Sequence, residues 1–466
     1  MDEFRTPTRY RLATLTAAAD SRRLCPILAP GEASGTLGRM GRFLLSAHHD
    51  PGHMLPVLSV ARALKARGHE VMLNASKKWQ AVAEAEGFPF VPYAAWDCTD
   101  PEDFAKLLYE SAGHLARGML PLVEEFRPDA LMSDVLSPAA GLAAEVAGLP
   151  FATMLIHPWH LPSRDLPAFG FPGNPGRTFL SRWRDAYIRA WQKHDLAKPL
   201  PLLNMARGMV GLPPTDDADA MSHNLVLVVT LPCMEYPRSD WPARARIVGP
   251  CLADLPGEVP ELPPGDDPLV VATTSTTGSF DNVLLETVLE ALAGEPIRLL
   301  AICGTRNLPD AKLPPNARLS PPCPIGPIMA HASAAVAHGG HGGVVKALSC
   351  GVPLVVIPFR GDQGENARRV EWSGAGRRLP PRRLSASRLN EAVRSLLDEP
   401  SYREAALAAR AQAVALDGPN YCARLLEELA GLGVPDGLPP TRLTTIGLIP
   451  EHPALSRMPS PLKTLR

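Results

Sequence analysis

The segment 334–376 reads AAVAHGGHGGVVKALSCGVPLVVIPFRGDQGENARRVEWSGAG, and it decides the fold expected for this chain of 466 residues. The apolar run Ala334–Ala337 predicts a buried strand, and the glycines after it lead into a helix over Gly342–Cys350. Gly351 ends that helix, and Val352–Phe359 predicts the next strand. A strand, a helix and a second strand in this order form the building block of a parallel sheet covered by helices.

The same alternation runs through both halves of the chain. In the first half, Arg42–Ala47 predicts a strand, Met54–Arg67 a helix and Glu70–Asn74 a second strand. Further helices are expected over 104–126, 139–147, 284–293, 367–373, 385–397 and 401–416, and further strands over 130–133, 151–155, 225–230, 246–248, 269–273 and 298–303. We therefore expect an α/β protein with two doubly wound, Rossmann-like domains that face a central cleft. Ligands of such sheets bind beyond the carboxyl ends of the strands.

The domain boundaries follow from changes in composition. Residues 1–40 show no sustained period, so we expect either a disordered arm or an extension ahead of a true start at Met40. Residues 157–214 interrupt the alternation with aromatic residues and prolines, which predicts a helical and loop insertion that lines a pocket. The expected organisation is an extension over 1–40, a first domain over 41–248, a proline- and acid-rich linker over 249–267, a second domain over 268–432 and a tail over 433–466.

Composition excludes several classes of function. The 47 basic and 48 acidic side chains leave a net charge of −1, so no overall positive field attracts nucleic acid. No apolar run reaches the roughly 18 residues that span a bilayer, so we expect no integral membrane association. The 8 cysteines are scattered and form no CxxC pair, which favours a cytoplasmic protein over a disulfide scaffold or a zinc site.

The glycine-rich turn between strand and helix is a candidate phosphate site. Glycines let backbone N–H groups approach a ligand without interference from a Cβ, and a helix N-terminus favours an anion. His338 could donate a hydrogen bond to the same anion, and the adjacent Asp362 and Gln363 suit sugar hydroxyls. The candidate binding residues of the turn are His338, Gly339, Gly340, Gly342 and Gly343. Tight packing alone is the alternative for the glycines, although it leaves the Asp-Gln pair unexplained.

Other nucleotide and metal motifs are weak or missing. The sequence contains neither GxxxxGK[ST] nor GxGxxG, so triphosphate hydrolysis and dinucleotide redox chemistry lose their usual anchors. His48 and His49 beside His53, and the spacing of His338 and His341, allow a metal site to be considered. An HHxxxH pattern on a loop is a weak metal signal, and a phosphate role is favoured for His338 and His341, so we expect no metal.

Two regions together resemble the family 1 glycosyltransferases of GT-B fold. Residues 324–376 are similar to the donor-binding signature of that family, which runs HGGxGTxxEAL, GVPxvvxP, DQxxNA and GAG. Gly52-His53-Met-Leu-Pro56 and the RGHEV segment 67–71 resemble its N-terminal element. The resemblance covers residues 42–430, and the most similar subfamily is the bacterial enzymes that glycosylate macrolides, polyketides and other natural products.

The resemblance implies a reaction and a set of roles. It implies inverting, metal-independent transfer of a sugar from a nucleoside diphosphate donor (UDP or dTDP) to a hydroxyl of a hydrophobic small molecule, with no cofactor. His53 would be the general base and Asp134, in LMSDVLSP, would orient and charge-balance it. An imidazole at the junction of strand and helix suits that task, although Asp134 could also be a simple strand-end acid. Thr276, in the segment TTSTT, would bind a donor phosphate.

Two departures from the family pattern and several alternatives remain open. The threonine and the glutamate of the family are here Gly343 and Lys346. Lys346 could touch the diphosphate, or the donor could lack a ribose 2′-hydroxyl.

We expect residues 157–191 and 104–126 to form the acceptor pocket. Transfer to a lipid or sterol at a membrane face, a catalytically silent auxiliary protein, and N- or C-glycosylation are the alternative functions.

Overall fold

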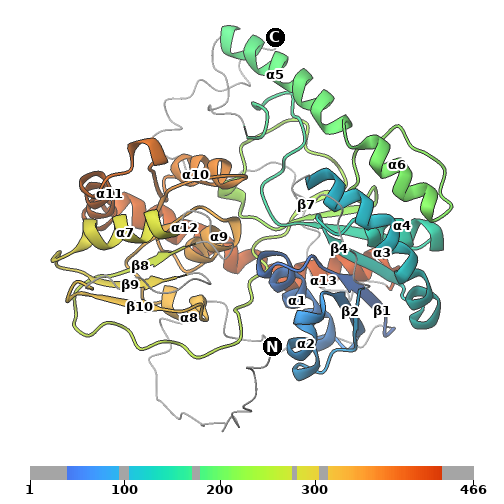
Figure 1. Cartoon of the computed structure of the whole chain (residues 1–466), viewed down its shortest axis with the longest axis horizontal. Coiled ribbons are helices and arrows are strands. Elements are labelled where there is room, and N and C mark those ends of the chain that lie inside the picture. The colour runs from blue at the N-terminus through green and yellow to red at the C-terminus, as the bar shows by residue number, and fades with distance from the viewer. Residues whose placement is uncertain (1–38, 94–103, 171–178, 275–280, 304–312, 433–466) are drawn as a thin grey trace, which may run out of the picture.

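The computed structural model describes residues 39–93, 104–170, 179–274, 281–303 and 313–432. Within this part of the chain, each half forms one parallel sheet, as Figure 1 shows. The strand order is β3-β2-β1-β4-β5-β6-β7 in the first sheet and β10-β9-β8-β11-β12-β13 in the second. In both sheets the order reverses beside the first strand in sequence, so the expected pair of doubly wound domains is confirmed.

The first half contains seven strands and six α-helices among the described residues. The strands are β1 (Arg42–Ser46), β2 (Glu70–Ala75), β3 (Phe90–Pro92), β4 (Ala130–Asp134), β5 (Phe151–Leu155), β6 (Leu225–Val228) and β7 (Ala245–Ile247). The helices are α1 (Pro51–Ala66), α2 (Gln80–Ala85), α3 (Phe104–Phe126), α4 (Ala139–Ala147), α5 (Phe179–Ala197) and α6 (Leu200–Met209).

The second half follows the same plan. Its strands are β8 (Leu269–Thr273), β9 (Arg298–Ile302), β10 (Ala317–Ser320), β11 (Ala334–Ala337), β12 (Leu354–Val356) and β13 (Gly376–Arg378). Its helices are α7 (Asp281–Leu292), α8 (Ile325–Met329), α9 (His341–Ser349), α10 (Gln363–Trp372), α11 (Ala386–Asp398) and α12 (Pro400–Leu416), and α13 (Gly418–Leu429) completes the described chain.

Each sheet is buried on both faces, which explains why its strands read as continuous apolar runs. Phe43 and Leu45 of β1 belong to one hydrophobic cluster, whereas Leu44 between them belongs to the cluster on the opposite face. In β8, Val271 and Val270 divide in the same way between two clusters. Successive side chains of a strand point to opposite faces, so an alternation of polar and apolar residues is not expected here.

Three short strands were missed by the sequence prediction. They are β3, β10 and β13, of three or four residues each, and all three lie at or beside an edge of their sheet. The predicted strand Val352–Phe359 is shorter in the structure, since β12 covers only Leu354–Val356. Segments this short carry too few residues to show a period.

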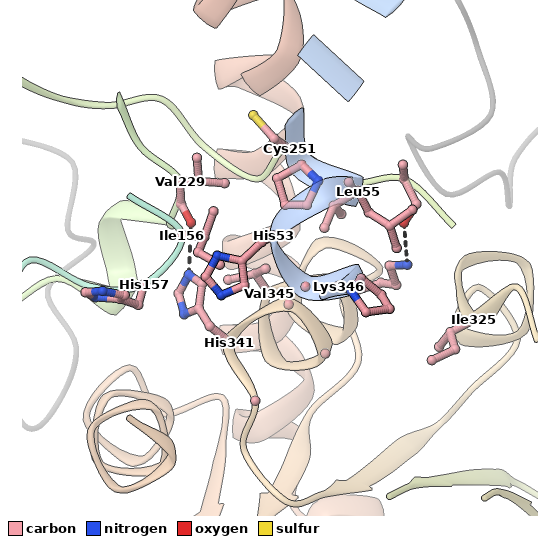
Figure 2. A pocket seen from close by; sticks show the side chains of 18 of the residues that line it. His53, Leu55, Ile156, His157, Val229, Cys251, Ile325, His341, Val345 and Lys346 are labelled. Carbon is pink, nitrogen blue, oxygen red and sulfur yellow. Dashed lines mark hydrogen bonds between the residues drawn. The ribbon is translucent and has the colours of Figure 1, made fainter. Parts of the chain in front are cut away.

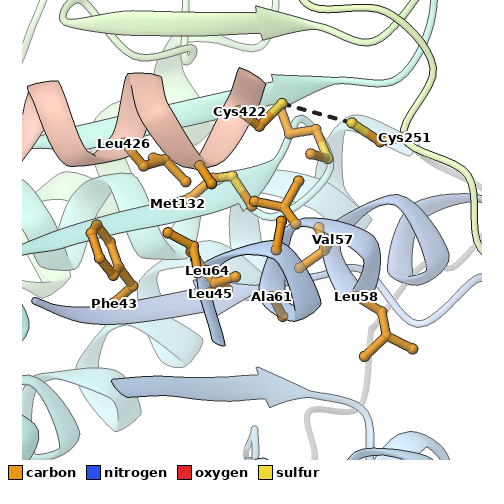
Figure 3. Close-up of a cluster of buried hydrophobic side chains, with 14 of the residues drawn as sticks. Phe43, Leu45, Val57, Leu58, Ala61, Leu64, Met132, Cys251, Cys422 and Leu426 are labelled. Carbon is orange, nitrogen blue, oxygen red and sulfur yellow. Dashed lines mark hydrogen bonds between the residues drawn. The ribbon is translucent and has the colours of Figure 1, made fainter. Parts of the chain in front are cut away.

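The assignment of all residues 268–432 to the second domain is wrong for α13. This helix packs against α1, and Cys422 and Leu426 join the hydrophobic cluster that contains Phe43 (Figure 3). Figure 1 shows α13, in red, beside α1 in the first half of the molecule. The apolar face of α13 thus completes the core of the first domain, and the chain crosses back after α12. Cys251, in the expected linker, lies in the same cluster, with its Sγ 3.7 Å from that of Cys422.

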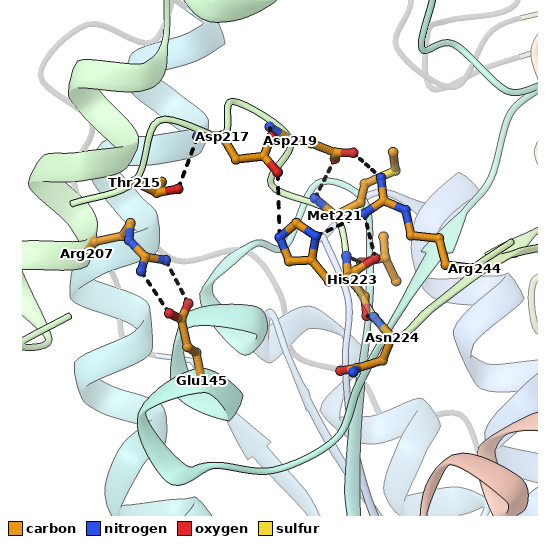
Figure 4. A network of polar contacts seen from close by, with 11 residues as sticks. Glu145, Arg207, Thr215, Asp217, Asp219, Met221, His223, Asn224 and Arg244 are labelled. Atoms are coloured by element: carbon orange, nitrogen blue, oxygen red, sulfur yellow. Dashed lines mark hydrogen bonds and ion pairs between the residues drawn. The ribbon is translucent and has the colours of Figure 1, made fainter. Parts of the chain in front are cut away.

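The expected insertion contains the helices α5 and α6. Arg207 of α6 makes two hydrogen bonds, of 2.7 and 2.8 Å, to Glu145 of α4, and Arg244 forms an ion pair with Asp219 in the loop that follows α6 (Figure 4). These contacts anchor α6 and the loop after it to the domain.

Helix α5 is exposed along one side, where four large side chains lie in line. Leu180, Trp183, Tyr187 and Trp191 are 79%, 68%, 73% and 54% exposed, at the helical spacing of three and four residues. None of the helices that the structure describes has the length and apolar character needed to cross a bilayer. The expected tail over 433–466, and all but two residues of the expected extension over 1–40, lie outside the described residues.

Candidate active site

His53 and Asp134 meet where the strand order of the first sheet reverses. β1 pairs with β4, and α1 begins five residues after β1, with His53 in its first turn. Asp134 is the last residue of β4. The carboxyl ends of neighbouring parallel strands share one edge, so the fold brings together two residues that are 81 positions apart in the sequence.

The carboxylate of Asp134 is fully buried and holds the imidazole of His53 by a short hydrogen bond between Oδ2 and Nδ1. Its other oxygen, Oδ1, accepts from the backbone N–H of His48 at 2.9 Å and from the hydroxyl of Ser137 at 2.5 Å. Because the carboxylate accepts from Nδ1, the proton of the ring lies on that nitrogen. Nε2 is then the nitrogen that offers a lone pair.

Two ionisable groups around His53 have shifted pKa values. Burial alone would raise the pKa of Asp134, but its hydrogen bonds from His53, Ser137 and the His48 N–H outweigh burial and lower it. Burial and the neighbouring His49 and His53 lower the pKa of His48 to about 4. Asp134 is therefore ionised and His48 uncharged at neutral pH.

The glycine-rich turn occupies the matching position in the second sheet. β11 pairs with β8, and Gly340 is the N-cap residue of α9. Gly339 has a φ of +95°, and a Cβ there would lie 2.7 Å from Cγ1 of Val356, so only glycine fits. A Cβ at Gly342 or Gly343 would meet no atom within 4 Å. The space beside these two glycines is therefore open, and the first N–H groups of a helix have no partner within the helix.

One cavity of about 480 Å³ joins these two regions. His53 and His338 both line it, and so do Gly340, Gly342 and Gly343. Figure 2 shows His53 above helix α9, which carries Val345 and Lys346. The volume is in the range typical of small-molecule sites. Further lining residues include Pro51, Gly52, Leu55, Pro56, Val135, Leu136, Ile156, His157, Val229, Cys251, Ala253, Asp254, Thr273, Thr274, Cys323, Ile325, Lys346 and Asp362.

The two members of the predicted Asp-Gln pair have different surroundings. Asp362 lines the cavity, and its Oδ2 accepts a hydrogen bond of 2.9 Å from Nδ2 of Asn366. Gln363 is buried, and its Oε1 accepts from the backbone N–H groups of Phe359 and Arg360 at 2.8 and 3.1 Å. Gln363 is not among the residues that line the cavity. Its amide oxygen shapes the loop that carries Asp362 instead.

His341 links the two halves, and both of its ring nitrogens contact protein groups. Its Nε2 donates to the carbonyl of Val229 at 2.9 Å, and Nδ1 lies 3.1 Å from Oδ1 of Asn366. The ring is buried, which lowers its pKa. Within the described residues, one group has metal-ligand spacing, and it consists of His48, His49 and Asp50 rather than His338 and His341.

Other predicted site residues fall elsewhere. Thr276 lies outside the described residues. From the expected acceptor segments 157–191 and 104–126, only His157 lines the described cavity.

Lys346 donates to Oδ1 of Asp254, at 2.5 Å, so its charge is directed to the linker and not to the glycine turn. Asp254 was missed because a single acid in a proline-rich linker carries no sequence signal.

A second buried network crosses the cleft beside the cavity. Arg369 of α10 contacts Glu235, which also accepts a hydrogen bond of 2.7 Å from the backbone N–H of Trp159. Glu365 of the same helix accepts from the backbone N–H of Gly170 at 2.9 Å. The loop after β5 is therefore tied to the second domain by buried charges. Two of these three contacts join residues more than 130 positions apart, so the sequence alone does not reveal the network.

The chain is similar in sequence and in fold to known glycosyltransferases. Residues 288–429 match the family described as erythromycin biosynthesis protein CIII-like, C-terminal domain. The chain is 31% identical over 421 residues to 4′-demethylrebeccamycin synthase of Lentzea aerocolonigenes, a match that covers 83% of this chain and 99% of that protein. It is 26% identical over 432 residues to 3-alpha-mycarosylerythronolide B desosaminyl transferase of Saccharopolyspora erythraea, covering 84% and 98%.

Solved structures share the two-domain architecture. The crystal structure of the glycosyltransferase of kitacinnamycin matches with a TM-score of 0.70 and 27% identity, over 84% of this chain and 99% of that one. The calicheamicin glycosyltransferase CalG4 matches with a TM-score of 0.67 and 22% identity over the same shares, a likeness of fold. The chain therefore belongs to the family 1 glycosyltransferases of GT-B fold, enzymes that transfer a sugar to a small-molecule acceptor.

Proposed function

We propose that this enzyme transfers a sugar, with inversion, from a UDP- or dTDP-sugar to a hydroxyl of a hydrophobic natural product such as a polyketide or macrolide. The observation that carries the proposal is the hydrogen-bonded pair His53–Asp134, which shares one cavity with the first turn of α9. The names of the relatives, a rebeccamycin synthase and a desosaminyl transferase, support an acceptor of this kind.

His53 would act as the general base. The acceptor hydroxyl binds near Nε2, gives its proton to that nitrogen and attacks the anomeric carbon through its oxygen. Asp134 keeps the ring in the required tautomer and stabilises the imidazolium that forms. Such a base contributes about 10²- to 10⁴-fold to the rate.

The glycine turn would stabilise the leaving group. As the bond from the anomeric carbon to the diphosphate oxygen breaks, the electron pair moves onto the diphosphate. The backbone N–H groups at the start of α9, together with His338, would face that charge, and the helix dipole adds to the stabilisation. None of these steps calls for a metal or a cofactor, and the nucleotide sugar is a co-substrate.

The acceptor would enter from the first domain. Leu55, Val135, Leu136 and Ile156 give the cavity wall near His53 an apolar character, which suits a ligand of low polarity.

The protein would work in a reducing compartment such as the cytoplasm. The six cysteines among the described residues are free thiols, which supports this location.

The deciding experiment combines turnover with nucleotide binding. The purified protein is incubated with UDP- and dTDP-sugars and a panel of aglycones, and products are identified by mass spectrometry. His53→Ala should lower kcat at least about 100-fold while the Kd of the nucleoside diphosphate changes less than about threefold. Unchanged turnover in that variant contradicts the base. Nucleotide binding without any turnover favours the silent auxiliary protein.

A second candidate function is transfer to a lipid acceptor at a membrane face. The exposed line of Leu180, Trp183, Tyr187 and Trp191 on α5 favours it, since aromatic side chains prefer the bilayer interface. Co-sedimentation with anionic vesicles tests it. Binding that is lost in a Trp183→Ala, Trp191→Ala double variant supports this function, and absence of binding by the unmodified protein removes it.

A further inference from the structure

The cavity has two ends that differ in chemistry. His53 and His157 lie toward one end, whereas Lys346 and Ile325 lie on the other side (Figure 2). The first turn of α9 lies between them. The assignment of ligand parts to these two ends rests on the proposed function. A nucleotide sugar carries its sugar on one side of the diphosphate and its ribose on the other. If the sugar reaches His53, the ribose lies at the end that holds Lys346.

Lys346 occupies this end without offering its charge to a ligand. It lies three residues after Gly343, about 4.5 Å further along the axis of α9. Its Nζ donates to the carbonyl of Ala253 at 3.0 Å and to Oδ1 of Asp254 at 2.5 Å. The lysine side chain is 10% exposed. The ammonium thus serves to hold the segment 253–254 against α9.

Asp254 is fixed from a second direction by α8. Its Oδ1 also accepts from the backbone N–H groups of Ile325 and Gly326, at 3.1 and 3.0 Å. Three donors therefore converge on Oδ1, and among the described residues no hydrogen bond is formed by Oδ2. The side chain is 16% exposed and lines the cavity. A carboxylate oriented in this way offers one oxygen to a ligand.

We propose that Asp254 is a specificity residue of the nucleotide site, whose Oδ2 accepts a hydrogen bond from one ribose hydroxyl, the 3′-hydroxyl. A vicinal diol that binds both oxygens of a carboxylate is excluded, because Oδ1 is occupied. The 3′-hydroxyl is the one that ribose and deoxyribose nucleotides share. Lys346 is the positioning residue, since it keeps Oδ1 engaged and turns Oδ2 to the cavity.

The test measures nucleotide affinity without an acceptor, by isothermal titration calorimetry. The unmodified protein should bind 3′-deoxythymidine diphosphate about 10- to 100-fold more weakly than dTDP, because a hydrogen bond to a charged group is lost. UDP and 2′-deoxyuridine diphosphate should bind within about threefold of each other, because the 2′-hydroxyl finds no free acceptor.

Asp254→Asn is the informative variant. The three donors at Oδ1 hold the amide oxygen, so the amide N–H₂ takes the place of Oδ2. The ratio of the two Kd values, 3′-deoxythymidine diphosphate over dTDP, should fall below about threefold. Asp266→Asn, an exposed acid in the same linker, should keep the ratio of the unmodified protein. A thermal unfolding scan establishes that each variant is folded.

The outcomes separate this proposal from the proposed function. If the unmodified protein binds dTDP but tolerates loss of the 3′-hydroxyl, the role of Asp254 is refuted and the glycosyl transfer stands. The same holds if Asp254→Asn keeps the full ratio. If the unmodified protein binds neither UDP nor dTDP, the proposed function itself is refuted. Should Asp254→Asn fail to fold, the comparison of the two nucleotides on the unmodified protein decides alone.

Discussion

Arg67 at the end of α1 and Glu427 in α13 are joined by two hydrogen bonds of 2.6 Å, although 360 positions separate them in the chain. His69 adds a third hydrogen bond, from Nε2 to Oε1 of Glu427, at 2.7 Å. The Nδ1 of this histidine accepts from the backbone N–H of Gly41, so the neutral ring satisfies both contacts. These bonds fasten the last described helix to the first domain.

Glu427→Gln should therefore destabilise the protein. The change leaves the guanidinium of Arg67 without its carboxylate partner in a site where both side chains are largely buried. Removal of one partner from such a pair costs about 3 kcal/mol of unfolding free energy. Urea unfolding followed by circular dichroism measures the loss. The control is Glu428→Gln, on the exposed side of the same helix, which should stay within about 0.5 kcal/mol. Equal midpoints for the two variants would contradict the anchoring role.

The same contact should make stability depend on pH in the acidic range. Burial opposes ionisation, but the hydrogen bonds from His69 and Arg67 prevail and lower the pKa of Glu427 to about 2 from 4.5. A carboxyl whose pKa is lower in the folded state stabilises it fully above the unfolded pKa. The contribution is lost as the pH falls from about 4.5 towards 2. The stability gap between the unmodified protein and Glu427→Gln should narrow across this window, and a gap that widens would argue against it.

Asp134→Asn tests the orientation of the proposed base. In this variant an amide N–H₂ group replaces one of the carboxylate oxygens that accept hydrogen bonds from His53 and His48. The ring of His53 must then move its proton from Nδ1 to Nε2, or it loses its hydrogen bond to residue 134. We expect kcat to fall about 10²- to 10⁴-fold, with little change in nucleotide affinity. Ser137→Ala removes one hydrogen bond and keeps the charge, so it should cost less than about tenfold. Similar losses in both variants would mean that Asp134 acts only through packing.

The glycines of the turn should differ in their tolerance. Gly339→Ala forces a Cβ to within 2.7 Å of Val356 at a φ of +95°, so we expect a loss of about 1–3 kcal/mol and weaker nucleotide binding. Gly342→Ala adds a methyl group in open space within α9 and should leave stability unchanged or slightly higher. Thermal unfolding and nucleotide titration on both variants check this. A tolerated Gly339→Ala would show that the turn can adopt another backbone path.

Much of the fold could be predicted because its signals are local. The helix α1 follows from the apolar spacing of Leu58, Ala61 and Leu64, and the strands β4, β5 and β11 are mostly apolar, with β11 apolar throughout. The alternation of strands and helices then implies parallel sheets, whose carboxyl ends meet at one edge. That rule placed His53 and His338 at a common cleft from the sequence alone, and both line the same cavity in the structure.

The polar partners of the site could not be predicted in the same way. Gln363 was expected to bind sugar hydroxyls, and its amide oxygen instead caps the Phe359–Arg360 turn. Lys346 was considered for the diphosphate, and it bonds to Asp254, 92 positions earlier. Hydrogen bonds form between whichever groups the fold brings within about 3 Å, and sequence spacing contains no record of those distances.

The amino-acid sequence by itself determined the two doubly wound domains, the glycine turn at the start of α9 and the position of His53 after β1, since each depends on neighbouring residues. Only the tertiary structure decided that α13 returns to the first domain, that His341 bridges to Val229 and that Asp254 faces the cavity. The reason is physical. A buried apolar face or charge takes its partner from the packed structure, and that partner can come from any distance along the chain.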